Sequence, residues 1–417
     1  MPRSDFRRFV GSILLSLLAD QLFLVTLTWA ALRGRPTPMT LGSVLTIAAL
    51  ARALGTPLGG ILADRHGAGP TLRRFYTVRG AVLAMAAAFT GIGGEPSTSA
   101  LYAIALAVGL LAGLVVSPQM TAIPGLVAPT ALARSNAIVQ GTIQISVVVG
   151  PPLAGFSLAH LAVGGSWGVS ASLAVGAGLG LGRVTISGPS QRPDEASGPP
   201  LRRILQQHPV LWSVLVVMGL VYLGLMGPVQ VGIPARVQQT LGDDPRTLGL
   251  LLGCFGAGML TGTVVAARVD CPPRVGLHLL AAVALIAAGL AVVGLGAHRG
   301  AGAPGAAAGL VLAGLGMGYF NVTGVSWLHR AIPRAAQGRV IGLVMLSANA
   351  TAPLSPLLAG WLAEDAVDPV FFIGAAVVGS AALVGLALPS LRRLTQVHPP
   401  ADEESAVRPM GAPDKSP

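Results

Sequence analysis

Charged side chains are scarce in this sequence. Only 10% of its 417 residues are Asp, Glu, Lys or Arg, whereas a water-soluble domain carries about a quarter. Apolar residues make up 53% of the chain, and its mean hydropathy is +0.71. Because so few charges cannot cover a soluble core, the composition excludes a soluble globular protein and predicts an integral membrane protein.

Cysteine is rare as well. Cys254 lies inside an apolar run and Cys271 in a charged loop, so no disulfide framework is expected. The seven histidines are scattered and lack the paired spacing of a zinc site. The sequence has no Gly-Lys-Ser/Thr phosphate-binding motif and no nucleophile constellation. We therefore expect no enzymatic activity, no catalytic residue, no metal and no cofactor.

Aromatic residues make up only 5% of the chain, and the arginines behind its net charge of +11 are spread over many loops. A nucleic-acid interface needs basic residues gathered in one patch, so none is predicted. Lys415 is the only lysine. Together with the many Ala and Gly residues, this preference for arginine favours a bacterial source.

Long apolar runs are what the chain has in abundance. A membrane-crossing helix needs about 20 consecutive apolar residues, and short loops separate most of the runs found here. The sequence predicts an all-α membrane protein with twelve transmembrane helices. The predicted spans are residues 9–32, 40–62, 76–94, 99–120, 136–160, 163–183, 208–234, 246–267, 275–297, 303–328, 339–362 and 368–390.

One connection differs from the others. Residues 184–207 are polar, rich in proline and much longer than the other loops. We interpret them as a cytoplasmic linker between an N-terminal six-helix bundle, residues 1–183, and a C-terminal six-helix bundle, residues 208–393. Residues 394–417 are expected to form a disordered cytoplasmic tail.

The arginines are distributed unevenly between the two sets of loops. With the N-terminus in the cytoplasm, most of them fall on the cytoplasmic side. Because cytoplasmic loops retain positive charge, we expect both termini inside a bacterial cytoplasmic membrane, with the first apolar run kept as a helix. The opposite loops are predicted to hold Arg33, Arg35, Arg236, Arg246 and Arg299.

The two halves repeat a pattern near their fifth helices. Pro151 and Gly155 follow an arginine at the same distances as Pro356 and Gly360 follow another. A Gly-x-x-x-Gly pair also recurs, beginning at Gly55 in the first half and at Gly258 in the second. Two similar halves predict a substrate site between them, reached from either side as one half rocks against the other.

Between the second and third runs the chain reads Gly-Ile-Leu-Ala-Asp-Arg-His-Gly, from Gly60 to Gly67. Closely spaced glycines with a carboxylate and an arginine suit a moving joint. This Gly-x-x-x-Asp-Arg-x-Gly pattern resembles the loop signature of the major facilitator superfamily of secondary transporters. The resemblance implies two six-helix bundles and a gating loop formed by Gly60, Asp64, Arg65 and Gly67.

The resemblance also implies a partner for Asp64. In the family the matching acid interacts with the start of the eleventh helix, which corresponds here to the region of Gly338 and Arg339. In physical terms an anion would rest on a helix N-terminus. We expect this contact to latch the inner side while the outer side is open; the alternative is a solvated loop charge.

The fourth and fifth runs resemble one branch of that family, which includes enterobactin-type siderophore exporters and macrolide-efflux proteins. The matching stretches include Ser117-Pro118 and Gly150-Pro151-Pro152-Leu-Ala-Gly155. Gly150, Pro151 and Gly155 resemble the proline-containing fifth-helix motif associated with exporters. The alternative is a kink that only shapes packing.

Asp20 is the most informative single residue. It lies about 18 to 20 Å from either end of the first run, near the middle of the membrane. A carboxylate there is costly and should face the bundle interior, where it can load and release a proton. The alternative is an acid paired with Arg52 or Arg79 that locks helices together.

Polar side chains recur every four residues on the fifth run, at Asn136, Gln140 and Gln144. This spacing predicts a polar stripe on one helix face. With Gln21 and Asn349 opposite, these amides would line a water-filled path. Alternatively, they join neighbouring helices by hydrogen bonds.

These patterns predict a secondary active transporter that moves a small amphipathic organic molecule, such as an antibiotic or a siderophore-like compound, out of the cell in exchange for protons. Its expected partners are the substrate, protons and membrane lipids, and it is expected to be a monomer. Uptake or lipid flipping by the same fold is one alternative. A membrane scaffold or sensor that has lost turnover is another.

Overall fold

The computed structural model describes residues 3–33, 37–182, 184, 210–269, 274–298, 302–332, 340, 342–344, 347 and 350–388. Over this part of the chain the regular structure is helical, and no strand occurs. The predicted linker lies outside the described residues apart from Val184, and the predicted tail lies outside them entirely.

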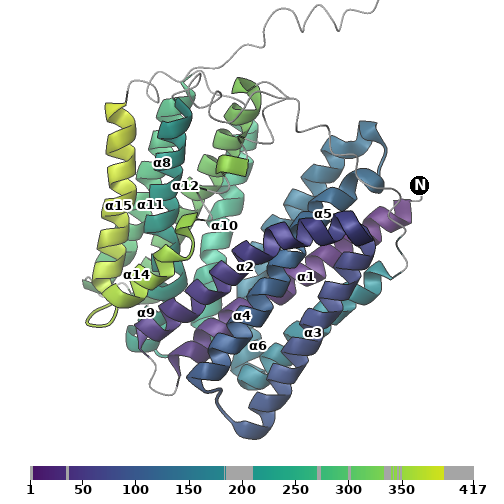
Figure 1. Ribbon diagram of the computed structural model, residues 1–417. Helices are drawn as coiled ribbons and strands as arrows, with labels where there is room; N and C mark the ends of the chain where they lie inside the picture. Colours follow the sequence, from purple (N-terminus) through teal and green to yellow (C-terminus); the bar gives the residue numbers. More distant parts are fainter. Residues whose placement is uncertain are drawn as a thin grey trace, which may run out of the picture.

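The helices form two bundles side by side (Figure 1). The first contains α1 (Arg3–Leu32), α2 (Pro38–His66), α3 (Ala68–Gly93), α4 (Thr98–Leu114), α5 (Val116–Ala122), the short turns η1 (Ile123–Gly125) and η2 (Pro129–Ala131), and α6 (Leu132–Leu181). The second contains α8 (Val210–Gly227), the π-helical turn η4 (Pro228–Gly232), α9 (Ile233–Thr240), α10 (Pro245–Val269), α11 (Val275–His298), α12 (Gly302–Ala331), α14 (Leu354–Leu362) and α15 (Asp368–Ala387).

Over the described residues, each of the twelve predicted runs contains helix in this order, which confirms the all-α membrane fold. By length and hydropathy, nine helices among the described residues are able to cross a membrane. The count is below twelve because α6 contains two predicted runs and the eleventh run is only partly described. The remaining run belongs to α3, which is not among the nine helices.

α6 folds back on itself and supplies the fifth and sixth spans. A straight helix of its 50 residues would be about 75 Å long, more than twice the apolar thickness of a bilayer. At Ala162 the backbone leaves the helical region, with φ of 52° and ψ of −169°. The Ser166 hydroxyl then donates to the Ser157 hydroxyl at 3.0 Å, which shows that the chain has reversed direction.

The repeated Gly-x-x-x-Gly pairs mark close helix contacts. A Cβ atom at Gly55 of α2 would come within 3.1 Å of the Gly113 Cα in α4. A Cβ atom at Gly258 of α10 would come within 3.0 Å of the Leu315 backbone nitrogen in α12. Small residues let membrane helices approach backbone to backbone, so the repeat in the sequence is a repeated packing contact in both bundles.

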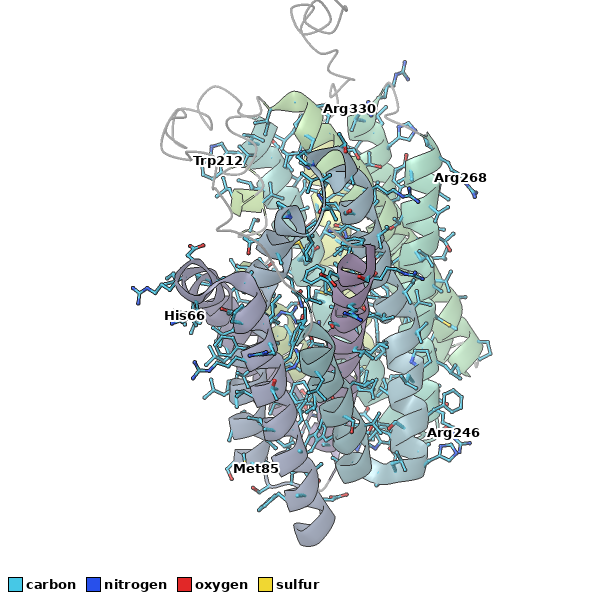
Figure 2. The ribbon with its side chains drawn as sticks, turned by 90° about the vertical axis from the view of Figure 1, so that its right-hand side faces the viewer. His66, Met85, Trp212, Arg246, Arg268 and Arg330 are labelled. Carbon is cyan, nitrogen blue, oxygen red and sulfur yellow. The ribbon has the colours of Figure 1, made fainter. Side chains whose placement is uncertain are left out.

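Large apolar side chains point away from the bundles (Figure 2). Met85 is 68% exposed and Trp212 is 57% exposed. Exposed apolar surface on this scale fits contact with lipid tails rather than with water. Arg246 lies near one end of the second bundle, and Arg268 and Arg330 lie toward the other (Figure 2).

We call the end of the bundles at which α1 finishes and α2 begins the outer end. The opposite end, where α1 begins and α2 finishes, is the inner end.

The structure corrects the predicted place of Arg236. It lies in α9 rather than in an outer loop, and it is only 3% exposed. Its guanidinium donates to the Val293 carbonyl of α11 and to the Asp368 carboxylate of α15, and it lies 4.3 Å from the centre of the Phe371 ring. In the sequence, a charged residue at the end of an apolar run is read as a loop residue. The carboxylate that allows Arg236 to be buried lies far along the chain and is not evident from the sequence.

Asp368→Asn should destabilise the second bundle, because Arg236 would remain buried without its counter-charge. Since Asp368 itself is a third exposed, we expect a loss of about 2 kcal/mol, the value of one charged hydrogen bond. The measurement is the melting temperature of the purified protein in detergent. Asp365→Asn, at an exposed acid three residues away, is the matched control; equal melting temperatures for the two variants would contradict a stabilising Arg236–Asp368 pair.

Candidate functional site

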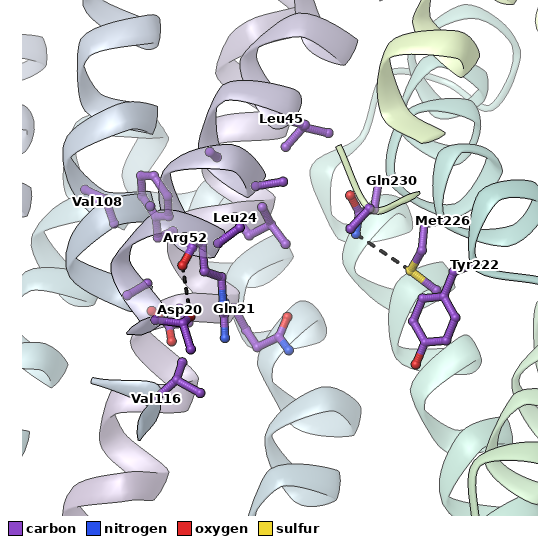
Figure 3. A pocket seen from close by; sticks show the side chains of 18 of the residues that line it. Asp20, Gln21, Leu24, Leu45, Arg52, Val108, Val116, Tyr222, Met226 and Gln230 are labelled. Carbon is purple, nitrogen blue, oxygen red and sulfur yellow. Dashed lines mark hydrogen bonds between the residues drawn. The ribbon is translucent and has the colours of Figure 1, made fainter. Parts of the chain in front are cut away.

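A cavity of about 670 Å³ lies between the two bundles. One wall comes from α1, α2 and α4, and the facing wall comes mainly from α8 and η4 (Figure 3). Most of the lining is apolar. The charged or hydrogen-bonding side chains that line the cavity are Asp20, Gln21, Arg52, Thr56, Tyr222 and Gln230.

Asp20 is placed on the cavity wall, as predicted, with 19% of its side chain exposed. Its carboxylate accepts a hydrogen bond of 2.6 Å from Arg79 of α3. The sequence left Arg52 and Arg79 open as partners, and the structure pairs Asp20 with Arg79. A carboxylate in mid-membrane is therefore neutralised by a guanidinium behind it, away from the cavity.

Arg79 is 1% exposed and anchors the pair inside the first bundle. Its second terminal nitrogen donates to the Ser16 carbonyl and hydroxyl at 3.1 and 3.0 Å. Its guanidinium carbon lies 5.8 Å from the centre of the Tyr76 ring, and the Gln119 amide donates to the Tyr76 hydroxyl at 2.7 Å. Because buried polar groups must find partners inside a bilayer, this network ties α1, α3 and α5 together around Asp20.

The fifth-helix motif forms a contact between the bundles. A Cβ atom at Gly155 would come within 3.0 Å of the Gly249 Cα in α10, and the Pro151 carbonyl lies against Gly249. Gly150 faces inward instead, where a Cβ atom would come within 2.6 Å of the Gln21 Cγ. The motif therefore seats one bundle on the other and leaves room for a cavity side chain.

The repeated motif in the second half makes the matching contact. A Cβ atom at Gly360 of α14 would come within 3.1 Å of the Gly42 Cα in α2. Beside it, the Thr46 hydroxyl donates to the Pro353 carbonyl at 2.7 Å. Two glycine pairs, Gly155 with Gly249 and Gly42 with Gly360, thus join the bundles near the outer end; we call them the outer glycine contacts.

Polar side chains add to this closure. The Gln238 amide donates to the Leu32 carbonyl at 2.5 Å. Two exposed contacts also cross between the bundles: Arg33 with Asp243 at 4.0 Å, and Arg246 with His160 at 3.4 Å. The cavity is therefore closed toward the outer end, while its lining continues along α2 from Leu45 to Pro57, toward the inner end.

The predicted gating loop is a turn of one residue. Gly67 ends α2 and precedes α3 directly, and its φ of 84° is strained for any residue with a side chain. Asp64 and Arg65 are exposed on the last turn of α2, and Gly60 faces Ser117 of α5. The expected latch partners, residues 338 and 339, lie outside the described residues.

The polar stripe is not brought to the cavity. Asn136 and Gln140 are exposed and do not line it, while the Gln144 amide donates to the Thr263 hydroxyl of α10 at 2.9 Å. Gln144 thus makes the helix-joining hydrogen bond that was the alternative interpretation. Gln21 does line the cavity, and Asn349 lies outside the described residues.

Sequence reasoning missed the second wall of the cavity. Tyr222, Met226 and Gln230 lie on α8 and η4 and face the first bundle (Figure 3). Gln230 is a polar residue inside an apolar run, and this could have indicated from the sequence that it lines the cavity. The π-helical turn at Pro228–Gly232 leaves no such signal, although turns of this kind are frequent at functional sites.

Comparison with known families decides what kind of protein this is. The profile of the Major Facilitator Superfamily matches residues 9–297 and 229–413, which together cover almost the whole chain. The chain belongs to the Major Facilitator Superfamily. It is accordingly a multi-pass membrane transporter of small molecules and not an enzyme.

Two relatives in this superfamily share about a quarter of their residues with the chain. The chain is 26% identical over 389 residues to the MFS-type transporter y4rN of Sinorhizobium fredii, covering 90% of this chain and 92% of the relative. It is 27% identical over 253 residues to the enterobactin exporter EntS of Citrobacter koseri, and that match spans 57% of each chain. The alignment with the exporter thus covers little more than half of the exporter's length.

Solved structures share the fold at low identity. A bacterial homologue of the iron transporter ferroportin, in its inward-facing state, superimposes with a TM-score of 0.70 at 17% identity, covering 93% of this chain and 98% of that one. The nucleoside transporter NupG superimposes with a TM-score of 0.72 at 14% identity, covering 92% and 99%. At these identities the likeness concerns the superfamily fold alone.

Gly155→Ala should weaken the outer closure of this superfamily member, because the added methyl group would collide with the backbone of α10. Gly141→Ala on the same helix is the matched control, since a Cβ atom there would meet nothing within 4 Å. The measurement is the distance distribution between spin labels at Glu95 and Glu364, with both native cysteines replaced by serine. We expect Gly155→Ala to lengthen the distances and Gly141→Ala to leave them unchanged; identical distributions would contradict a gating role for the contact.

Proposed function

We propose that the protein is a secondary active exporter that moves a small amphipathic organic molecule out of the cell in exchange for protons. It would work as a monomer among membrane lipids, by rocking its two bundles about the central cavity. The observation that carries this proposal is the Asp20–Arg79 pair on the wall of a cavity that both bundles line.

The shape and lining of the cavity support an organic substrate. A volume of about 670 Å³ falls within the range of cavities that hold drug-sized ligands. Apolar side chains such as Phe23, Leu24 and Leu45 form much of the wall, and Gln21 and Gln230 offer amides from opposite sides. A molecule with an apolar body and a few polar groups satisfies such a lining.

The Asp20–Arg79 pair supports proton coupling. While Asp20 is ionised, its 2.6 Å hydrogen bond holds α1 to α3. A proton arriving from the cavity would remove the charge that Arg79 needs and would weaken that hold. Since Asp20 is partly exposed and Arg79 is buried, the proton has access to the carboxylate but not to its partner. Proton loading therefore biases how the first bundle packs.

Export is the direction favoured by the relatives. The enterobactin exporter of Citrobacter koseri matches this chain over 253 residues, and Pro151 and Gly155 of the exporter-like motif contact the second bundle at the closure. An outward path would begin with substrate entering from the inner end and would end when the outer glycine contacts separate.

Asp20→Asn alone is an ambiguous test, because Arg79 would be left buried without a counter-charge, at a cost of about 3–5 kcal/mol. The double variant Asp20→Asn/Arg79→Met removes both charges and should fold. If the pair only locks helices, the double variant should transport as the parent does. If Asp20 carries the proton, the double variant should be folded but unable to exchange substrate for protons.

The measurement uses purified protein in liposomes that contain a pH-sensitive dye, challenged with a panel of amphipathic antibiotics and catechol-containing chelators. The parent should show compound-dependent proton movement, and the folded double variant should show at least a tenfold loss. Asp5→Asn, at the exposed end of α1 where Asp5 lies 3.9 Å from Arg8, is the control. Undiminished proton exchange by the double variant would contradict the proposed proton coupling. Accumulation of the compound in the direction of uptake would contradict the proposed direction of transport.

A further inference from the structure

Arg52 is a third charged residue in the middle of the membrane, besides Asp20 and Arg79. It lies on α2, fourteen residues from Pro38 and fourteen from His66, so it sits about 21 Å from either end of the helix. Its side chain is exposed and lines the central cavity (Figure 3). Charged side chains are rare at this depth and normally face a partner or a water-filled path that uses them.

No counter-charge meets Arg52 in the part of the chain that the structure describes. No Asp or Glu of those residues lies within 4.0 Å of its guanidinium, and the Asp20 carboxylate is engaged by Arg79 at 2.6 Å. The acid on the same helix, Asp64, is about 18 Å away along the axis. The charged groups at the cavity are thus one neutralised pair and one arginine that no carboxylate neutralises.

The described residues of the facing wall do not supply a negative charge either. Its polar groups are the Tyr222 hydroxyl and the Gln230 amide, and the Gln230 amide has only a 3.9 Å contact with the Met226 sulfur. The acids that the structure describes in the second half, such as Asp243 and Asp368, lie near the outer end. The space between the bundles therefore carries an excess positive charge with neutral acceptors and donors opposite it.

We propose that Arg52 binds an anionic group of the substrate, and that the transported compound is an organic anion such as a carboxylate, sulfonate or ionised phenol. This rests on the proposed function, since it names the substrate class of the same cavity. A guanidinium presents a planar fork of donors that suits two oxygens of one acidic group. The apolar body of the compound would lie against the cavity wall, with its far end near Tyr222 and Gln230.

Exchange of such an anion for a proton has an electrical consequence. An anion leaving the cell and a proton entering it both move positive charge inward, so each cycle is driven by an inside-negative membrane potential. The two ligands need not compete for one group, because the anion binds Arg52 and the proton binds Asp20. The anion needs to be bound while the carrier turns outward, and the proton while it turns inward.

The test compares two dyes of the same xanthene framework, anionic 5-carboxyfluorescein and cationic rhodamine 123. Their binding to the purified protein in lipid nanodiscs is measured by fluorescence anisotropy, without any proton gradient. We expect the parent to prefer the anion, Arg52→Gln to lower its affinity about tenfold, and Arg52→Lys to lower it less than Arg52→Gln does, because lysine keeps the charge but loses the fork of donors. Arg74→Gln, at an exposed arginine near the inner end of α3, should change nothing.

The inference is overturned if the parent shows no preference for the anionic dye, if rhodamine 123 binds more tightly, or if Arg52→Gln binds the anion as the parent does. Its failure is distinguishable from that of the proposed function. Anion binding through Arg52 without Asp20-dependent proton movement would keep the inference and remove the proton coupling. Proton exchange with a cationic compound would keep the proton coupling and remove the inference.

Discussion

The hydrogen-bonded pair of Asp20 and Arg79 is the constraint on which the first bundle depends. Arg79 is buried, and a buried charge without a partner is costly, so its place depends on the Asp20 carboxylate 2.6 Å away. Arg79 also donates a hydrogen bond to the Ser16 hydroxyl, and its guanidinium lies over the Tyr76 ring. The Tyr76 hydroxyl in turn accepts a hydrogen bond from Gln119. The contacts of that one guanidinium join α1 to α3 and reach α5 through Tyr76 and Gln119.

Three arginines show why residue type alone does not reveal a role. Arg79 and Arg236 are both buried and paired with a carboxylate from another helix, yet one pair lies at the cavity and the other near the outer end. Arg52 has the same chemistry in an apolar run, but it faces open space between the bundles. Partner and exposure distinguish them, and both depend on contacts between residues far apart in the chain.

The parts of the fold that follow from local patterns could be predicted from the sequence. Apolar run lengths gave the order of the spans, and the spacing of Pro and Gly revealed two equivalent halves. The depth of Asp20 followed from counting residues along one helix. The position of Arg236 and the function of Gln144 did not follow, because Asp368 and Thr263 are more than a hundred residues away from them.

The second wall of the cavity was hidden for a related reason. Tyr222, Met226 and Gln230 recur every four residues and therefore share one helix face, but a hydropathy pattern does not show that this face lies opposite the first bundle. Gly155 was recognised within a motif, but its contact with Gly249 depends on how two bundles meet. Sequence periodicity describes single helices well and the surface between two bundles poorly.

The outer glycine contacts join the bundles through bare backbone, with no interlocking side chains to be released one by one. Separating the glycine contacts needs no change of side-chain rotamer, and the closure then rests on a few polar contacts such as those of Thr46, Gln238 and Arg33, so the free-energy difference between the closed and open forms can be small. A ligand must favour one form by about 5.5 kcal/mol to move a population from 1:99 to 99:1. With a closure of this kind, the differential affinity of a single bound molecule is enough to shift the population from the closed to the open form.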